Sequence, residues 1–339
     1  MSTSIKLSIL DQSIVRRNMT AKDALENTIE VAKLADELGY HRFWVSEHHN
    51  SSAIAGTAPE ILMMRLASDT KHIRIGSGGV MLPNHSELKV AENFRILETL
   101  FPGRIDLGMG RAPGTDRLTS ALLNPSNNFS EQEYLQQLEN LQLYFTDSAS
   151  TKYGSVIAAP VTETIPAQWI LSSSGGSSKI AAKYGMGLSV AKFINGDVTP
   201  LAVELYMNNF QPSEQLQKPK TFLSITVLCA ETEEEANALR FQTDYALLNF
   251  AKGNFGEFWD YQDIKNYEFT TSDRQIIHQN SNRIVSGTPD RVKEKLEQLA
   301  KDFYTDEIMI TTMNTSPKDR IQIFKLLAKE FNLKSQQLS

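Results

Sequence analysis

The sequence predicts a (β/α)8 TIM barrel with insertions, formed by a single domain over residues 1–339. Eight short apolar segments with strand character alternate with segments of helical periodicity, which is the pattern of this fold. Several of these segments end in polar or glycine-rich turns. A doubly wound parallel sheet is the alternative. Its G-x-G-x-x-G fingerprint is absent after the first strand, where the chain reads Leu10-Asp11-Gln12-Ser13.

The individual elements follow from apolar periodicity and from helix start and stop residues. The expected strands are 5–10, 42–46, 73–76, 104–108, 168–171, 187–190, 221–229 and 307–311. The expected helices are 20–38, 59–69, 87–100, 130–145, 177–184, 199–210, 232–248, 288–301 and 317–330. Thr20 and Ser130 are typical N-caps, and Glu133 would complete a capping box with Ser130. Gly39 is a typical residue just after a helix end.

Two stretches do not fit this alternation. Residues 146–167 are small, polar and turn-rich, and we expect an insertion there. Residues 252–283 are polar, aromatic-rich and irregular, as in a lid or a second insertion. The aromatic residues of this stretch would form either an apolar pocket wall or a small satellite core, and they include Phe255, Phe258, Trp259 and Tyr261.

The composition excludes several classes of protein. The net charge is −6 and there is no basic stripe, which argues against nucleic-acid binding. One cysteine and six histidines exclude a cysteine-rich zinc site and a disulfide framework. The start of the chain lacks the pattern of a signal peptide, and no stretch of about 18 apolar residues predicts a membrane span. We therefore expect a cytoplasmic protein.

The predicted second strand ends in Glu47-His48-His49. Strand ends are where α/β barrels carry their chemistry, and histidine suits proton transfer near neutral pH. Successive strand residues point to opposite sides, so His48 and His49 should not both face one ligand. H-E-x-x-H is also absent, so we expect no metal site. One of the two histidines is a candidate general acid or base, although both can also be structural strand-end groups.

The third and fourth predicted strands end in glycine-rich turns. Three glycines within Gly76-Ser77-Gly78-Gly79 indicate special backbone angles, the close approach of a flat ligand, or a simple β-bulge. After the fourth strand, Gly110 leaves room beside the guanidinium of Arg111, which suits a phosphate unless Arg111 is a plain surface residue. Pro113 and Gly114 follow where a dinucleotide-binding loop would start a helix, which excludes that motif.

A serine- and glycine-rich loop follows the fifth predicted strand and leads into a helix. Its residues include Ser173, Ser174, Gly175, Gly176 and Ser177. Hydroxyl and backbone N–H groups at such a position form an anion site, or merely an N-cap in a flexible loop. The fourth and fifth strands are neighbours in a barrel, so Arg111 and this loop can hold one phosphate together.

These motifs, in this order, resemble the bacterial luciferase-like family of flavin-dependent monooxygenases. The resemblance extends from Ile5 to about Phe331, and its specific part is 43–49, 73–83, 103–111 and 172–178. It is greatest with the single-chain luciferase-like oxidoreductases of unassigned substrate. The resemblance implies a (β/α)8 barrel with FMN, arriving as FMNH2, at the C-terminal ends of the strands.

The resemblance also implies roles for individual residues. His48 takes the place of the catalytic histidine, which gives or accepts a proton during the reaction of the flavin with oxygen. Arg111 takes the place of the phosphate-binding arginine, and Gly78-Gly79 that of a non-prolyl cis peptide beside the flavin ring. The remaining implied cofactor contacts are Glu47, Ser173, Ser174, Gly175, Gly176 and Ser177.

The implied activity is an FMNH2-dependent monooxygenase that uses O2 and a small apolar or carbonyl-type organic substrate. A separate NAD(P)H:flavin reductase would supply FMNH2, and the family usually forms homodimers. The alternatives are an F420-dependent reductase and a non-catalytic flavin-binding protein. The flavin-binding protein would not need His48. The reactive cysteine of luciferase aligns with Gly110, which would leave more space near the flavin and argues against light emission.

Overall fold

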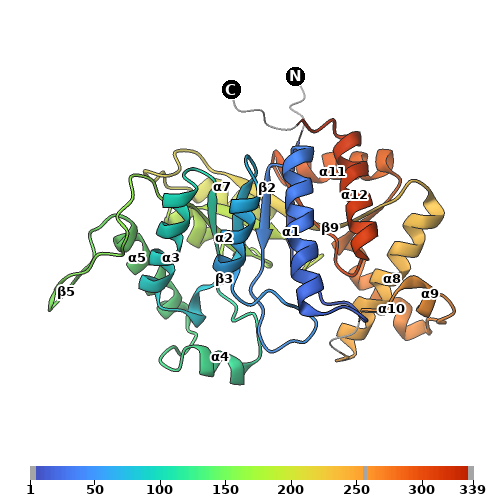
Figure 1. The fold of residues 1–339 in the computed structure, drawn as a ribbon, viewed down its shortest axis with the longest axis horizontal. Helices are drawn as coiled ribbons and strands as arrows, with labels where there is room; N and C mark the ends of the chain where they lie inside the picture. Colours follow the sequence, from blue (N-terminus) through green and yellow to red (C-terminus); the bar gives the residue numbers. More distant parts are fainter. Residues whose placement is uncertain (1–4, 255–257, 335–339) are drawn as a thin grey trace.

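The computed structural model describes residues 5–254 and 258–334 and contains a closed barrel (Figure 1). Eight parallel strands form the ring in the order β1-β2-β3-β4-β7-β8-β9-β11, and β11 pairs with β1. They are β1 Lys6–Asp11, β2 Arg42–Val45, β3 Arg74–Met81, β4 Ile105–Gly110, β7 Ala167–Ser172, β8 Gly187–Ala191, β9 Thr221–Cys229 and β11 Glu307–Thr311. The predicted (β/α)8 fold is confirmed.

Helices cover the outside of the ring close to their predicted bounds. They are α1 Ala21–Leu38, α2 Pro59–Asp69, α3 Glu87–Leu100, α5 Glu131–Phe145, α6 Ser178–Lys183, α7 Leu201–Asn209, α8 Glu233–Ala251, α11 Pro289–Asp302 and α12 Pro317–Glu330. Thr20 and Asp23 form a complete capping box on α1. The box predicted at Ser130 is only half formed, because the Glu133 carboxylate accepts from the backbone of Asn128 instead.

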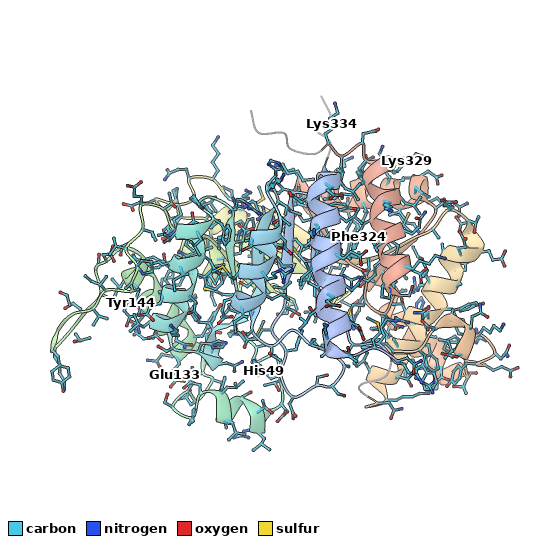
Figure 2. The ribbon with its side chains drawn as sticks, viewed as in Figure 1. His49, Glu133, Tyr144, Phe324, Lys329 and Lys334 are labelled. Atoms are coloured by element: carbon cyan, nitrogen blue, oxygen red, sulfur yellow. The ribbon has the colours of Figure 1, made fainter. Side chains whose placement is uncertain are left out.

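The outer core lies between the ring and its helices. Val31 on α1 and Leu327 on α12 are fully buried members of it. Phe324 lies between these two helices in Figure 2, and the edge of its ring meets the buried ring of Tyr40. This packing holds the helices around the barrel and leaves the strand ends free to carry other side chains.

A second, smaller core fills the barrel interior. It contains Leu10, Trp44, Trp169, Phe222 and Met309, packed together with the buried guanidinium of Arg42. Arg42 donates to Asp106 on β4 over 2.6 Å and to Glu307 on β11 over 2.5 Å. This mixed apolar and ionic cluster closes the interior, and its members Leu10, Trp44 and Met309 line the cavity described below.

The two predicted insertions have regular structure. In 146–167, β5 (Ser150–Thr151) and β6 (Gly154–Ser155) form a hairpin that projects at the left of Figure 1. The expectation that 252–283 is irregular is wrong for its described residues. They contain α9 (Tyr261–Ile264), α10 (Thr271–Asn280) and the 3-10 turn η2 (Ser281–Arg283). A capping box of Thr270 and Asp273 starts α10 within a polar sequence.

Three further elements were not predicted. They are the 3-10 turn η1 (Leu82–Asn84), the helix α4 (Arg117–Leu123) and the strand β10 (Ile284–Gly287), which pairs with the C-terminal part of β9. Strands β3 and β4 also run further than expected, to Met81 and Gly110, because their glycines lie within the strands. Among the described residues, no helix has the length and apolar character needed to cross a membrane.

Candidate active site

A cavity of about 990 Å³ opens above the interior cluster, among the C-terminal ends of the strands. Leu10, Trp44 and Met309 form part of its floor, and the segment from α8 to η2 contributes one wall. Helices α4, α9 and α10 gather on the lower side of Figure 1, and His49 lies on the same side in Figure 2. Six predicted site residues line the cavity: His48, Gly78, Arg111, Ser173, Ser174 and Ser177.

His48 has a defined tautomer. Its Nδ1 lies 3.3 Å from the Gly114 carbonyl oxygen, which can only accept, so Nδ1 carries the proton. The unprotonated Nε2 lies 3.4 Å from the amide nitrogen of Gln12. Burial lowers the pKa of His48, although the Gly114 carbonyl and the Glu47 charge act in the opposite direction. The imidazole is therefore neutral at pH 7, with a basic nitrogen beside the cavity.

Glu47 is fully buried, and its carboxylate binds protein groups instead of bordering the cavity. Its oxygens accept from the backbone N–H of Met81 at 2.9 Å and from Asn84 at 3.1 Å. The Nε2 atoms of His49 and His85 lie within 2.8 and 2.9 Å of Oε1. Burial alone would raise the pKa of Glu47, but these partners hold it below its usual value. Glu47, predicted as a cofactor contact, is therefore not among the cavity-lining residues, and its carboxylate is held by protein groups.

The backbone around Gly78 is unusual. The Gly78–Gly79 peptide is cis, as the family resemblance implied, and the register between β3 and β4 shifts there. A Cβ at Gly78 would lie 2.7 Å from Cδ1 of Leu10, so no side chain fits between this strand and the floor. Gly79 itself is not among the cavity-lining residues.

Gly110 does not leave the extra space that its alignment with a cysteine suggested. A Cβ there would lie 2.7 Å from the sulfur of Met81, so the Met81 thioether already fills this position. Both Gly110 and Met81 line the cavity. The wall beside this strand is therefore formed by the soft, polarisable side chain of Met81.

Arg111 and the serine-rich loop border the same cavity. The Arg111 side chain is 42% exposed and donates to Glu131, at the start of α5, over 2.5 Å. In the loop, Ser172 accepts from the backbone N–H of Gly175, whose φ of +82° favours glycine. Gly175 and Gly176 shape the loop without lining the cavity, while Ser173, Ser174 and Ser177 of the loop line it together with Ser172 at the end of β7. This combination of a guanidinium and hydroxyls suits a phosphate.

The wall formed by α8 to η2 contains residues that the sequence did not reveal. Gln279, Asn280 and Arg283 line the cavity, together with Gln12 from the loop after β1. The capping box that starts α10 is the one sequence signal for this wall. The sequence alone does not indicate that these side chains lie in the same cavity as His48.

Of the predicted lid aromatics, Phe258 is buried and lines the cavity, and it also belongs to a small separate core with Ala53 and Ala246, so both predicted alternatives apply to it. Trp259 instead packs under the guanidinium of Arg17, 3.9 Å from its ring centroid. Tyr261 borders a different cavity, and Phe255 lies outside the described residues.

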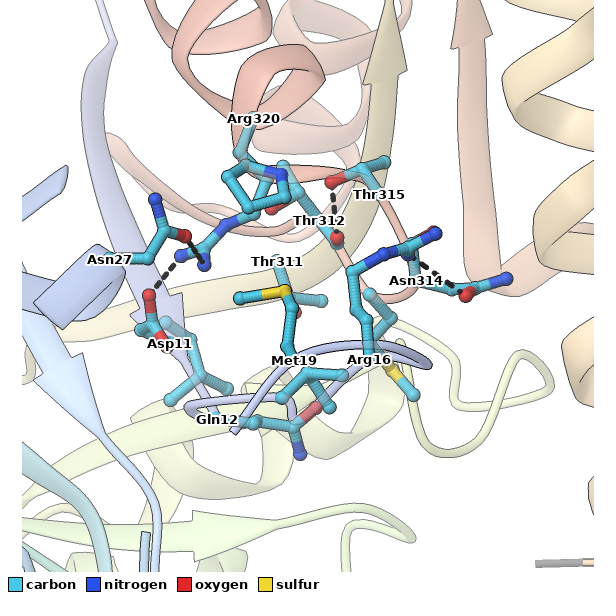
Figure 3. Close-up of a pocket in the computed structure, with 14 residues that line it drawn as sticks. Asp11, Gln12, Arg16, Met19, Asn27, Thr311, Thr312, Asn314, Thr315 and Arg320 are labelled. Atoms are coloured by element: carbon cyan, nitrogen blue, oxygen red, sulfur yellow. Dashed lines mark hydrogen bonds and ion pairs between the residues drawn. The ribbon is translucent and has the colours of Figure 1, made fainter. Parts of the chain in front are cut away.

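The segment that carries Phe258 is anchored to the loop after β1. Arg16 donates to Asp260 over 2.6 Å and to the carbonyl oxygen of Asn314 over 2.5 Å. Figure 3 shows the contact between Arg16 and Asn314, and beside it Arg320 bonded to Asp11 and Asn27. These contacts fix the wall of the cavity to the ends of β1 and β11.

The fold and the site define a (β/α)8 barrel with a large cavity at the C-terminal ends of its strands, and comparison with known proteins identifies its family. The family model described as "Luciferase-like monooxygenase" matches residues 5–306, and the chain belongs to this family. It is 42% identical over 330 residues to the uncharacterised protein YwcH of Bacillus subtilis, covering 96% of this chain and 99% of that protein. It is 35% identical to the N-acetyl-S-alkylcysteine monooxygenase of the same organism, covering 96% and 97%.

Solved structures share the fold. Apo-MsnO8 superposes with a TM-score of 0.91 at 34% identity, covering 97% of this chain and 99% of that one. The oxygenating constituent of 3,6-diketocamphane monooxygenase from Pseudomonas putida, solved with FMN, has a TM-score of 0.72 at 18% identity and covers 99% of both chains. An F420-dependent secondary alcohol dehydrogenase has a TM-score of 0.68 at 14% identity, covering 97% and 99%. The last two likenesses concern the fold alone.

Proposed function

We propose that the protein is an FMNH2-dependent monooxygenase that inserts one oxygen atom of O2 into a small organic substrate. The observation that carries this proposal is the cavity itself. It brings a neutral His48, the Gly78 backbone, Arg111 and three loop serines together at the strand ends. These residues come from four different strand ends, as in other barrel enzymes.

The cavity residues fit FMN. The apolar side chains of Leu10, Trp44 and Leu171 offer a surface for the flat ring, beside glycine backbone at Gly78. Arg111 and the hydroxyls of Ser173, Ser174 and Ser177 would hold the phosphate, with Arg111 leaving Glu131 to do so. Reduced FMN supplies the electrons that activate oxygen.

The protein groups have separate tasks in this proposal. Nε2 of His48 would accept and return a proton at the reacting centre, while Gly114 keeps the proton on Nδ1. Phe258 and the neighbouring wall would exclude water from the closed cavity. The mainly apolar wall favours a small apolar or carbonyl-type substrate.

FMN and its supply are also part of the proposal. The FMN-bound structural neighbour is called an oxygenating constituent, and a 25% identical relative from Acinetobacter baylyi is called an oxygenase component. By analogy, a separate NAD(P)H:flavin reductase would provide FMNH2.

We further propose a homodimer, because isoleucine and leucine side chains on the adjacent helices α2 and α3 are exposed.

An anaerobic titration with FMNH2, followed by mixing with O2, tests the function. We expect binding and a measurable delay before the absorbance of oxidised flavin returns, because the closed site slows unproductive oxidation. FMNH2 binding without any delay would instead favour a flavin-binding protein. No binding of either FMN form, with binding of F420, would favour a deazaflavin-dependent reductase.

A further inference from the structure

The cavity lining contains two guanidinium groups, Arg111 and Arg283, and no carboxylate among its described residues. Arg111 is paired with Glu131. Arg283 has no hydrogen bond or ion pair with any described residue, and its buried Nε has no acceptor. A partly buried cation without an acceptor costs free energy in a mainly apolar cavity. A ligand that carries an anionic group would supply such an acceptor.

Arg283 and Arg111 belong to different parts of the ring. Arg111 follows β4, beside the serine loop that follows β7. Arg283 ends η2 and precedes β10, which pairs with β9, and the strands β7 and β8 separate β9 from β4. The two arginines therefore do not come from neighbouring strand ends, and the phosphate site expected at Arg111 does not require Arg283.

The aliphatic part of Arg283 is held in place by a glycine. A Cβ at Gly196, in the turn after β8, would lie 3.1 Å from Cγ of Arg283 and 3.0 Å from Cβ of Asn282. The absence of a side chain at Gly196 thus lets η2 pack closely against this turn. The stem of Arg283 is fixed by packing, while its guanidinium remains available to the cavity.

We propose that Arg283 binds a carboxylate on the organic substrate, which rests on the proposed oxygenase function and specifies its substrate class. A guanidinium pairs with a carboxylate through two parallel hydrogen bonds, which also fixes the orientation of the bound molecule. Phe193, Ile194 and Phe258 line the same cavity and suit an apolar body. The substrate class is thus a small organic acid whose apolar part reaches toward His48.

Binding of matched acids and amides to the FMN-loaded protein tests this assignment. The probes are straight-chain carboxylates from acetate to octanoate and the corresponding primary amides, titrated by calorimetry. We expect the wild-type protein to bind at least one carboxylate about tenfold or more tightly than its amide. Arg283→Gln should abolish this preference without changing the amide affinity, and Arg283→Lys should retain part of it.

Arg274→Gln is the matched control, because it removes the same charge from α10 at an exposed position outside the cavity lining. It should leave the carboxylate preference intact. Equal binding of acids and amides by the wild type, or a preference that survives in Arg283→Gln, would overturn the proposal. So would a loss of FMN affinity in Arg283→Gln as large as in Arg111→Gln, because Arg283 would then bind the cofactor phosphate.

The same titrations on FMN-free protein separate this proposal from the proposed function. If the wild type binds no FMN but keeps an Arg283-dependent carboxylate preference, the oxygenase proposal fails and the anion site remains. If FMN binds and the delayed oxidation is seen, but acids and amides bind alike, the oxygenase proposal stands and the anion site fails.

Discussion

At the scale of single residues, the proposed chemistry depends on the protonation of His48. Gly114 accepts from Nδ1, and burial lowers the pKa, so Nε2 is an unprotonated base across the neutral range. The adjacent Glu47 is held by Asn84, His49 and His85, and its charge acts to raise the pKa of His48. The Gly114 contact thus places the proton on Nδ1 and leaves Nε2 as the proton acceptor.

His48→Ala should keep FMN affinity within about twofold and lower the oxygenation rate by about 10²-fold or more, the usual effect of losing a general acid or base. In the wild type, kcat/KM should fall on the acid side with a midpoint below the ordinary histidine pKa of about 6.5, because only the neutral imidazole accepts a proton. Stopped-flow turnover across pH checks both. Normal turnover in His48→Ala would exclude the assignment.

Arg111 is the second residue whose role can be isolated. Arg111→Ala should weaken FMN binding by about 2 kcal/mol, because a charge-assisted contact to phosphate is lost. Glu131→Gln removes the present partner of Arg111 and should leave FMN binding unchanged or tighter. Fluorescence titration measures both dissociation constants. An unchanged constant in Arg111→Ala contradicts the phosphate role.

At the scale of elements, β3 and β4 approach each other more closely than side chains permit. A Cβ at Gly108 would lie 2.2 Å from the carbonyl oxygen of Ser77, and Ser77 also donates to the Gly108 carbonyl over 2.9 Å. Strand β3, which carries Gly78 at the cavity, is therefore held close to the backbone of β4. Its position beside the cavity depends on glycine, not on packing of large side chains.

Gly108→Ala should lower the free energy of unfolding by about 1–3 kcal/mol, the range for overpacking a tight site. Gly176→Ala is the control, because the nearest atom to its added Cβ is the Ser174 hydroxyl at 3.5 Å. Urea unfolding followed by circular dichroism compares the two. Equal midpoints for the two variants would mean that β3 and β4 can separate without cost.

The ring was predictable because strands buried in a parallel barrel read as apolar runs bounded by turns. The C-terminal ends of β3 and β4 were not predictable, because glycine residues normally indicate a turn. At Gly76, however, a Cβ would lie 2.4 Å from the Trp44 indole nitrogen, so glycine is needed inside the strand. His48, Arg111 and the loop serines were predictable because they follow strands directly. Arg283 depends on how α10 and η2 fold back, which no local pattern encodes.

At the scale of the whole molecule, one ionic cluster joins distant strands through the barrel interior. Arg42 on β2 binds Asp106 on β4 and Glu307 on β11, and Arg74 on β3 also donates to Asp106. Burial alone would raise the pKa of Asp106, but Arg42 and Arg74 hold it well below its usual value. Protonation of the carboxylates in this cluster would therefore weaken contacts that hold the ring of strands closed.

The lowered pKa values of Asp106 and Glu307 fix the direction of the acid response. Their stabilisation is present above the unfolded pKa of about 4 and is lost as pH falls toward the folded values. Asp106→Asn should cost about 3–5 kcal/mol at pH 7, because Arg42 loses a buried partner, and should flatten the acid dependence. Urea unfolding at pH 7, 4 and 3 measures this. Asp69→Asn, in an exposed pair with Arg65, is the control.

The outer surface of the barrel gives the last prediction. Ile61 on α2 is 73% exposed and Leu100 on α3 is 56% exposed, and these helices pack side by side. Exposed apolar side chains on two adjacent helices favour association of two copies. Light scattering at micromolar concentration should give a dimer, and Ile61→Asp should shift it toward a monomer. Leu201→Asp on α7, at a site 56% exposed, should leave the dimer intact. A wild-type monomer, or equal effects of both variants, would place the interface elsewhere or exclude it.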